Sequence, residues 1–266
     1  MKIVIFKGGL GNQLFQYVFY NYLIKNNYKK IYGFYDKKSM IHNGFELDYC
    51  FSNISLPKNS FISDFIVYIY KAKNKLIGLN KIDKKDNYNK EKIIFDGYWQ
   101  SLSFFSPDII NNLSFNTNLT QENSSLLSII KSRNSISVHI RRGDYLNLQS
   151  VYGNICTKEY YSKAMELIKQ KVPDSSFVFF SDDMDWVKQN FNIDGALYVD
   201  WNTRRDSYVD MYLMSNCKHN IIANSTFSWW GAYLNKNYDK IVISPAKWFN
   251  TEINDIDIIP DNWIKI

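Results

Sequence analysis

The stretch SISVHIRRGDY, residues 135–145, decides how the second half of the chain folds. Small and apolar residues alternate over 135–140, as in a buried strand, and two arginines, a glycine and an aspartate follow directly. If the extended path continues, His139 and Arg141 lie on one side of the strand and Arg142 on the other. Arginine is scarce, with only five among 266 residues, so this pair predicts a bound anion.

The residues after the arginine pair favour a site rather than a plain turn. Gly143 permits a sharp bend, and Asp144 either holds an arginine in place or acts as a base. Ligands of open α/β sheets bind at the carboxyl ends of strands, where guanidinium groups fit phosphate oxygens bidentately. The alternative is a structural salt bridge between Asp144 and one arginine.

Strands and helices alternate regularly from Ser135 onward. The pattern predicts strands at 135–140, 176–180, 196–200, 220–223 and 240–244, and helices at 158–171, 185–191, 207–217 and 228–234. Repeated units of this kind predict a parallel sheet covered by helices on both faces, a doubly wound, Rossmann-like domain. We place the boundary near residues 120–135, which gives domains at 1–132 and 133–266.

Two further strands in this half end in polar turns. Asn224, Ser225 and Thr226 open an aromatic helix, where hydroxyl groups and the helix dipole favour a phosphate. Asp182 and Asp183 follow another strand, and either carboxylate can accept hydrogen bonds from guanine. Helix capping is the alternative in both turns. We expect no metal site from the acidic pairs Asp183/Asp185 and Asp255/Asp257.

The N-terminal half also begins as an α/β unit, with a strand at 2–6 and a helix from about Asn12 to Lys25. Glycines in the loop at 8–11 let backbone amides approach a ligand, while the amides of Asn12 and Gln13 suit the hydroxyl groups of a sugar. A tight turn capped by Asn12 is the alternative.

The same glycine loop argues against a nicotinamide-dependent oxidoreductase. The dinucleotide fingerprint requires a third glycine at position 14, which is Leu14 here.

Residues 61–70 are expected to form an amphipathic helix, followed by a solvated connector at 71–92 and a strand at 93–99. One interpretation of 61–75 is a buried domain helix; the other is a membrane-surface helix, because lysines follow the apolar residues. Residues 1–132 carry 17 lysines and no arginine against 10 acidic residues, a net charge of +7. The simplest interpretation of this excess is a solvated surface.

Composition narrows the class of protein further. No apolar segment of about twenty residues and no signal-peptide profile is present, which predicts a cytoplasmic protein with at most a peripheral contact at the inner membrane surface. Cys50, Cys156 and Cys217 lack metal-ligand spacing and are expected to be reduced core thiols. No nucleic-acid-binding motif is present.

Four motifs occur in order along the chain: GGLGNQLFQY at 8–17, HIRRGDY at 139–145, FSDD at 180–183 and ANSTFSWWGAYL at 223–234. Together they resemble the motifs of glycosyltransferase family 11, the α-1,2-fucosyltransferases. The resemblance implies a GT-B fold of two Rossmann-like domains facing a central cleft, with GDP-fucose in the C-terminal domain and the acceptor on the N-terminal side. It also implies inverting, metal-independent transfer of L-fucose to the 2-hydroxyl of a galactose-terminated glycan, with no cofactor.

Residue by residue, the resemblance gives three groups of side chains. Arg141 resembles the arginine that holds the β-phosphate, supported by Arg142, and Ser225 and Thr226 match the region near the diphosphate. His139 and one of Asp182 or Asp183 lie where guanosine is recognised. The glycine loop matches the one that faces the sugar. The expected binding residues are His139, Arg141, Arg142, Asp182, Asp183, Asn224, Ser225, Thr226, Gly9, Gly11 and Gln13. The expected catalytic residues are Arg141, Asp144 and Asn12.

This chemistry agrees with the residue types. When a glycosyl bond to a diphosphate breaks, negative charge grows on the β-phosphate, and groups aimed there stabilise the transition state more than the ground state. Asp144 is one candidate base, and a departing phosphate oxygen is another. A non-catalytic sugar-nucleotide-binding protein would share these residues and is the second alternative, beside the oxidoreductase.

Overall fold

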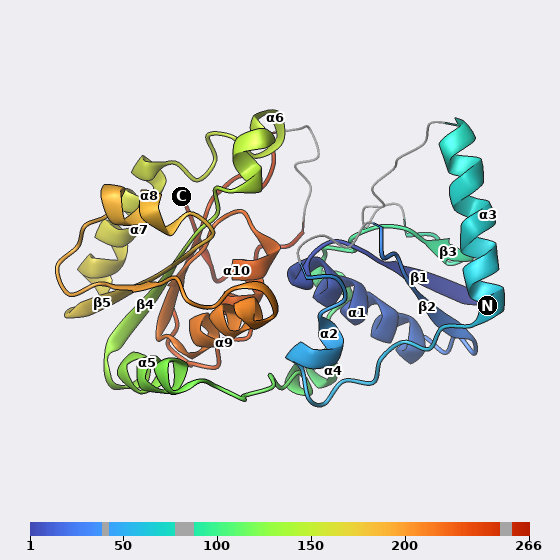
Figure 1. Ribbon diagram of the computed structural model, residues 1–266, viewed down its shortest axis with the longest axis horizontal. Helices are drawn as coiled ribbons and strands as arrows, with labels where there is room; N and C mark the ends of the chain where they lie inside the picture. The colour runs from blue at the N-terminus through green and yellow to red at the C-terminus, as the bar shows by residue number, and fades with distance from the viewer. Residues whose placement is uncertain (39–42, 78–87, 251–256) are drawn as a thin grey trace. The chain divides into compact units, whose positions relative to one another are not determined.

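The computed structural model describes residues 1–38, 43–77, 88–250 and 257–266. The chain divides into two compact units, Met1–Asn116 and Thr117–Ile266, each built on its own parallel sheet (Figure 1). The α/β class predicted from the sequence is confirmed in both units.

Unit 1 has a three-stranded sheet of order β2-β1-β3, formed by β1 (Lys2–Phe6), β2 (Ile31–Tyr35) and β3 (Ile94–Phe95). Every pair is parallel. The expected strand at 2–6 is confirmed, but the one at 93–99 is only two residues long, because Ile94 and Phe95 alone pair with β1. The helices of this unit are α1 (Leu10–Lys25), α2 (Leu47–Cys50), α3 (Phe61–Ile77) and α4 (Pro107–Asn111).

The helix expected at 61–70 is present and longer than predicted. Residues 71–77 continue α3, so they are not part of a connector; residues 78–87 of that predicted connector lie outside the described residues. The helix packs beside the edge strand β2, where Val67 joins a core of Ile3, Ile5 and Phe34. One side of α3 is therefore part of the unit 1 core.

Unit 2 has a six-stranded parallel sheet of order β6-β5-β4-β7-β8-β9. Numbered along the chain within this unit, the order is 3-2-1-4-5-6, that of the Rossmann fold. Its strands are β4 (Asn134–Ile140), β5 (Ser175–Ser181), β6 (Leu197–Val199), β7 (His219–Ile221), β8 (Val242–Ser244) and β9 (Ile264–Lys265). The predicted parallel sheet is confirmed, although β9 was not expected.

Helices cover both faces of this sheet (Figure 1). Ile136 and Val138 of β4 pack with α7 and α8, whereas Ser135 bonds to α5 and His139 contacts α10 on the opposite face. The predicted alternation along β4 therefore separates the two helical layers. The helices are α5 (Gln121–Ser132), α6 (Gln149–Tyr152), α7 (Lys158–Lys171), α8 (Met184–Asn190), α9 (Tyr208–Asn216) and α10 (Thr226–Tyr233).

Helix α5 belongs to unit 2. Its buried Leu126 and Ile130 face inward, and the Ser135 hydroxyl donates to the Ile130 carbonyl at 2.8 Å. The sequence-based boundary after residue 132 falls at the end of α5, whereas the contacts divide the chain at Asn116. The acceptor-side and donor-side roles of the two domains stay predictions.

The three cysteines differ in burial. Cys50 and Cys217 are buried, Cys156 is half-buried, and none of the three forms a disulfide bond. Burial raises the pKa of the Cys156 and Cys217 thiols to about 12. In the described part of the chain, no helix has both the length and the apolar character that crossing a membrane requires.

Candidate functional site

The candidate site of unit 2 lies at the carboxyl edge of its sheet. β4 runs between β5 and β7, and the chain leaves β4 toward β5 on one side and starts again at β7 on the other. This reversal is the topological switch point, where ligands of open α/β sheets bind. The arginine pair follows β4, the paired aspartates follow β5, and Asn224 to Thr226 follow β7, so three predicted motifs meet at one edge.

Arg141 is held between two carboxylates. Its Nε and Nη2 both donate to Asp144 Oδ1 at 2.9 Å, and its Nη1 lies 3.1 Å from Asp182 Oδ2. Burial lowers the pKa of Arg141, but the charges of Asp182 and Asp144 outweigh it and raise that pKa overall. The salt bridge expected as the alternative is present, and it fixes the plane of a guanidinium whose side chain is 19% exposed.

Arg142 points to a different set of partners. Its Nε donates to Asp183 Oδ2 at 3.0 Å, and its guanidinium carbon lies 4.0 Å from the centre of the Trp186 ring. Asp183 also accepts from the Trp186 amide and caps α8. The capping interpretation of Asp183 is thus confirmed, and the same carboxylate anchors the second arginine. Its predicted guanosine contact stays a prediction.

Gly143 gives the loop its close approach to β5. A Cβ at this position would lie 2.6 Å from Asp182 Oδ2, inside contact distance. The carboxylate that meets the Gly143 backbone also accepts the Arg142 amide at 2.9 Å and binds Arg141. Asp182 therefore sets the position of both arginines, a role that the sequence did not suggest.

His139 is buried beneath the arginines. Burial, together with the charge of Arg141, lowers the pKa of His139 to about 4, against the opposing effect of Asp182. Its ring lies 5.7 Å from that of Phe227, and its Nδ1 has no hydrogen-bond partner among the described residues. A buried ring nitrogen without a partner is costly and is typical of a functional site.

Tyr145 joins the β4 end to the β7 end. Its hydroxyl donates to the Asn224 carbonyl at 2.9 Å, and its ring centre lies 5.9 Å from the Arg141 guanidinium carbon. The ring also stacks on Tyr152 at 4.1 Å. Sequence reasoning assigned no role to Tyr145 or Trp186; the available signal was an aromatic residue within four positions of an arginine or an aspartate.

The turn after β7 is firmly held. The Asn224 side chain donates to the Trp248 carbonyl at 3.0 Å, and Ser225 caps α10 by accepting from the Phe227 amide at 3.4 Å. Asn224 and Ser225 are buried, whereas Thr226 is partly exposed. The capping alternative is confirmed for Ser225, and the start of α10 lies beside β4, where the helix dipole favours an anion.

The glycine turn of unit 1 also lies at a switch point, between β1 and β3. Gly8 has a φ of 77°, and a Cβ there would lie 2.8 Å from Asn12 Nδ2. Asn12 Oδ1 accepts from Gln100 Nε2 at 2.8 Å. Gly9, rather than Asn12, occupies the N-cap position of α1. Gly11 is buried in the first turn of that helix.

Gln13 has an internal role. It is fully buried, its Nε2 donates to the carbonyls of Gly8 and Gly44 at 2.9 and 2.8 Å, and its Oε1 accepts from the Glu46 amide. Glu46 in turn accepts from the Leu10 amide. Contact between Gln13 and a sugar hydroxyl, as the sequence suggested, would require these bonds to break.

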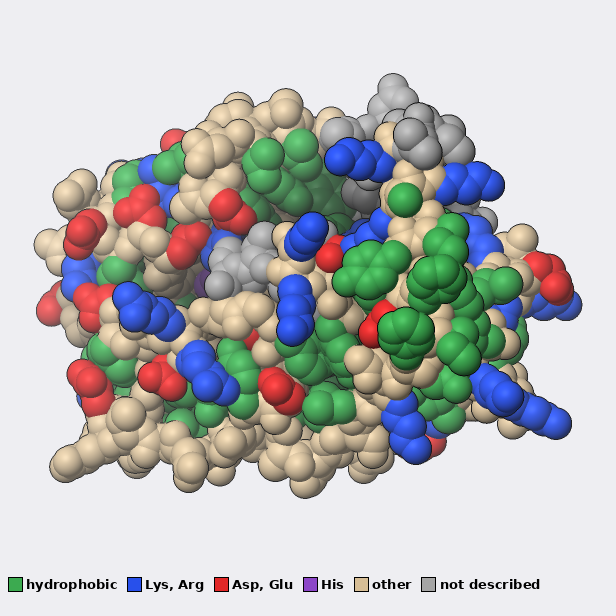
Figure 2. Space-filling view, turned by 45° about the vertical axis from the view of Figure 1, so that its right-hand side comes forward, with side chains coloured by type: hydrophobic (Ala, Val, Ile, Leu, Met, Phe, Trp, Pro, Cys, Tyr) green, Lys and Arg blue, Asp and Glu red, His purple; other side chains and the backbone are tan. Residues whose placement is uncertain are grey.

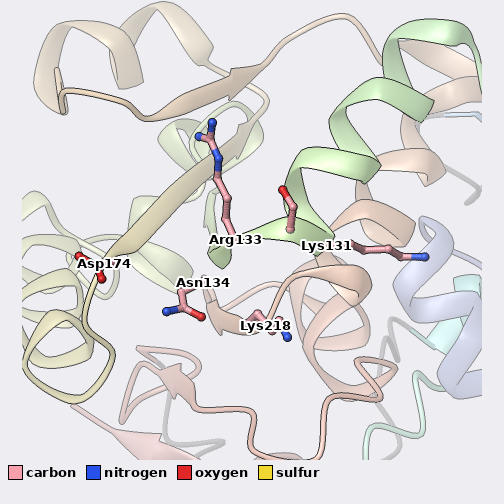
Figure 3. A pocket seen from close by; sticks show the side chains of 6 residues that line it. Lys131, Arg133, Asn134, Asp174 and Lys218 are labelled. Carbon is pink, nitrogen blue, oxygen red and sulfur yellow. The ribbon is translucent and has the colours of Figure 1, made fainter.

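A surface hollow of about 360 Å³ lies elsewhere on unit 2 (Figure 3). Its lining residues Arg133, Asn134, Asp174 and Lys218 precede or begin strands, so it sits at the amino edge of the sheet. Figure 3 shows the charged side chains pointing in different directions. Convergent polar groups mark a ligand site, and this hollow has none.

Comparisons with known proteins agree with this geometry. The family model described as Glycosyl transferase family 11 matches residues 1–266. An α-1,2-colitosyltransferase of Escherichia coli is 35% identical, with 100% of this chain and 99% of that protein covered. The O-antigen biosynthesis glycosyltransferase WbnK of the same species is 32% identical over 97% and 98% of the two chains.

More distant similarities extend to fucosyltransferases. Galactoside α-(1,2)-fucosyltransferase 2 of Rattus norvegicus is 26% identical over 53% of this chain and 43% of its own. A crystal structure of the α-1,6-fucosyltransferase NodZ with GDP has a TM-score of 0.51 at 14% identity, covering 86% of this chain and 91% of that one. At this identity the likeness concerns the fold alone.

Proposed function

The chain belongs to glycosyl transferase family 11, and from this premise we propose that it transfers L-fucose from GDP-fucose to the 2-hydroxyl of a galactose-terminated glycan. The relatives support the reaction class, since their names include α-1,2-colitosyl and α-1,2-fucosyl transfer. The observation that carries the proposal is Arg141, fixed between Asp144 and Asp182 at the switch point of unit 2.

The donor would lie along the carboxyl edge of the unit 2 sheet. Arg141 and the start of α10 would bind the diphosphate, and Arg142 would support them from the β5 side. His139 and the loop after β5 would be next to the guanosine. The uncharged state of His139, implied by its pKa of about 4, leaves it able to accept a hydrogen bond near neutral pH.

The reaction would invert the anomeric carbon. The hydroxyl oxygen of the glycan attacks C1 of fucose while the bond between C1 and the β-phosphate oxygen breaks. The β-phosphate oxygen takes the electron pair of the broken bond. The arginine side chains would stabilise the growing charge because they are already oriented and need no reorganisation. We expect Asn12 and the glycine turn to contact the acceptor or the sugar.

The attacking hydroxyl group of the glycan must give up its proton to a base. Asp144 Oδ1 already accepts two hydrogen bonds from Arg141, which favours an orienting role for Asp144. A phosphate oxygen of the departing GDP is then the better proton acceptor. Asp144, which the sequence suggested as a catalytic base, is then a positioning residue that determines where Arg141 points.

GDP-colitose is the second candidate donor. The relative that is 35% identical over the whole chain is an α-1,2-colitosyltransferase. Colitose differs from fucose in lacking the 3-hydroxyl, so both sugars would present the same diphosphate to unit 2. A donor pair that differs in one hydroxyl group can be separated by kcat/KM, since a site that binds this hydroxyl discriminates against the analogue.

The deciding experiment is a matrix of donors and acceptors. GDP-fucose and GDP-colitose are incubated with a panel of galactose-terminated glycans, and the linkage of each product is determined by NMR. The expected result is an α-1,2-linked fucose. A product formed only with GDP-colitose would show that colitose, rather than fucose, is the sugar transferred. GDP binding without transfer would favour a non-catalytic binding protein. Binding of NAD instead of GDP would favour the oxidoreductase.

We also propose that the transfer needs no metal ion. The oriented guanidinium donors of Arg141 and Arg142 would stabilise the charge that develops on the β-phosphate in place of a divalent ion. Activity should be unchanged after dialysis against excess EDTA, and added Mg²⁺ should not raise it. Loss of activity in EDTA that is restored by one divalent ion would contradict this.

A further inference from the structure

Helix α3 of unit 1 is apolar on two opposite sides. Its inner side packs against the β2 core through the fully buried Val67, with the partly buried Ile66 and Tyr70 beside it. Its outer side carries Phe61, Ile62, Phe65, Tyr68 and Ile69, whose exposed fractions lie between 54% and 86%. The described part of the chain exposes twelve large hydrophobic side chains, and five of the twelve lie on α3.

The outer residues form one stripe. Successive residues of an α-helix turn by about 100°, which places all five within about a third of the circumference. Figure 2 shows hydrophobic side chains gathered on the side of the molecule where α3 lies, with basic side chains next to them. A contiguous apolar surface of this kind on a water-soluble unit usually marks an interaction site.

Two lysines border the stripe. By the same helical geometry, Lys73 lies about 20° beyond one edge of the stripe and Lys75 about 20° beyond the other. Both are exposed, whereas Lys71 lies farther round the helix and pairs with Asp36. An apolar stripe flanked by basic residues is the pattern of helices that lie in the interface of a lipid bilayer.

We propose that the outer face of α3 binds the surface of a membrane that contains anionic lipids. The aromatic and aliphatic side chains would enter the boundary between headgroups and acyl chains, and Lys73 and Lys75 would contact lipid phosphates. The charge of the unit agrees, because residues 1–116 carry 16 lysines and no arginine against 9 acidic residues, a net charge of +7. Anionic leaflets attract such basic surfaces.

The same charges argue against a second copy as the occupant. Two copies joined through this stripe would bring together two units that each carry a net charge of +7. A lipid surface has the complementary sign. The proposal concerns binding only and is independent of the transfer reaction.

The test is flotation of the full chain with vesicles. Vesicles of phosphatidylcholine with 30% phosphatidylglycerol are compared with vesicles of phosphatidylcholine alone. We expect binding to the anionic vesicles, with a loss of about tenfold or more in the double variant Phe61→Ser/Phe65→Ser. Lys73→Glu/Lys75→Glu should weaken binding to a similar extent.

Tyr238→Ser is the matched control, because Tyr238 is 96% exposed in unit 2 and lies outside the stripe. It should float as the wild type does. The proposal is overturned if the wild type fails to float with anionic vesicles, or if Phe61→Ser/Phe65→Ser floats normally. An equal loss in Tyr238→Ser would also overturn it. Sedimentation velocity adds a further arm: a dimer lost in the double variant, without vesicle binding, would assign the stripe to a second copy. Circular dichroism confirms that each variant is folded.

Discussion

Arg141 shows how two carboxylates at one strand end fix the direction of a guanidinium group. Two carboxylates hold its guanidinium, and one of them, Asp182, also holds the backbone of Arg142. A carboxylate that binds an arginine neutralises part of its charge, yet it also fixes its direction. Preorganised donors act more strongly on a developing charge than mobile ones, because no reorganisation is needed during the reaction.

Arg141→Ala should therefore lower kcat by roughly 100- to 1,000-fold, or about 2.7 to 4 kcal/mol of barrier. Steady-state transfer of fucose, with the thermal midpoint measured in parallel, checks this. Arg133→Ala is the matched control, since Arg133 is exposed at the amino edge of the same sheet and should keep full activity. Unchanged turnover in Arg141→Ala would remove Arg141 from the mechanism.

Gly143→Ala tests the position of Asp182 without removing a charge. The added methyl group would lie 2.6 Å from Asp182 Oδ2 and must displace that carboxylate or the loop. We expect GDP to bind about tenfold or more weakly, as a loss of well-placed charged hydrogen bonds implies. Isothermal titration with GDP measures it. Wild-type affinity would mean that Asp182 does not determine the arginine geometry.

The sequence predicted much of this site at the level of residues. The spacing of His139, Arg141 and Asp144 placed them at one strand end, and the structure places them there. The contacts of Asp182 with the two arginines were not foreseen, because these partners come from a loop forty residues earlier that only the parallel pairing of β4 and β5 brings near. Such a partnership depends on sheet order, which no local pattern encodes.

Long elements were predictable and short ones were not. β4 and β5 have regular apolar patterns over seven residues each and were found within one residue of their ends. β2 and β9 were missed, because the glycine in IYGFY and the brevity of β9 leave no clear period. Strands of this kind form because a neighbouring strand already supplies their hydrogen bonds.

Helices α5 and α9 are linked by a network of polar side chains, in which Asn123 is buried and Asn202 and Asp210 are partly buried. Asn202 donates to Asp210 Oδ1 on α9 at 2.8 Å and to Asn123 Oδ1 on α5 at 3.0 Å. Burial raises the pKa of Asp210 from 3.8 to about 8, although the bond from Asn202 opposes this. The carboxyl group is thus protonated in the folded protein at neutral pH, while in the unfolded chain it is ionised.

This raised pKa makes stability depend on pH in a defined direction. The protonated Asp210 contributes fully to the free energy of unfolding below pH 3.8. This contribution is lost as pH rises toward about 8, by at most about 1.4 kcal/mol per pH unit. Asp210→Asn should remove this loss, so its free energy of unfolding should exceed that of the wild type more at pH 7.5 than at pH 5. Urea denaturation at both pH values measures it.

Asp174→Asn is the control for this prediction, since Asp174 is exposed and lies outside the network. It should follow the wild-type pH dependence. Equal pH dependence in Asp210→Asn and the wild type would show that Asp210 does not titrate as described.

At the scale of the whole chain, each unit repeats the same design of a parallel sheet with a polar turn at its switch point. Unit 1 has the glycine turn with Asn12, and unit 2 has the arginines. The sequence predicted both turns, but it placed the division after residue 132 because α5 gives no sign of which sheet it covers. The excess of lysine lies in unit 1, whereas the residues proposed to bind a diphosphate belong to unit 2.

The proposed assignment of GDP binding to unit 2 predicts which amides GDP protects from hydrogen exchange. If unit 2 alone binds the nucleotide, saturating GDP should slow amide hydrogen exchange at 141–145, 182–186 and 224–228, the three loops that meet at its switch point. Exchange in α3 should be unchanged, since the stripe proposed to bind lipid has no part in the nucleotide site.

At a GDP concentration of about 100 times Kd, binding should also add about 2.7 kcal/mol to the stability of unit 2. Exchange measured by mass spectrometry with and without GDP distinguishes the outcomes. Protection confined to unit 1, or around Lys131 and Lys218 at the amino edge, would place the nucleotide elsewhere and leave the arginine pair as a structural ion network.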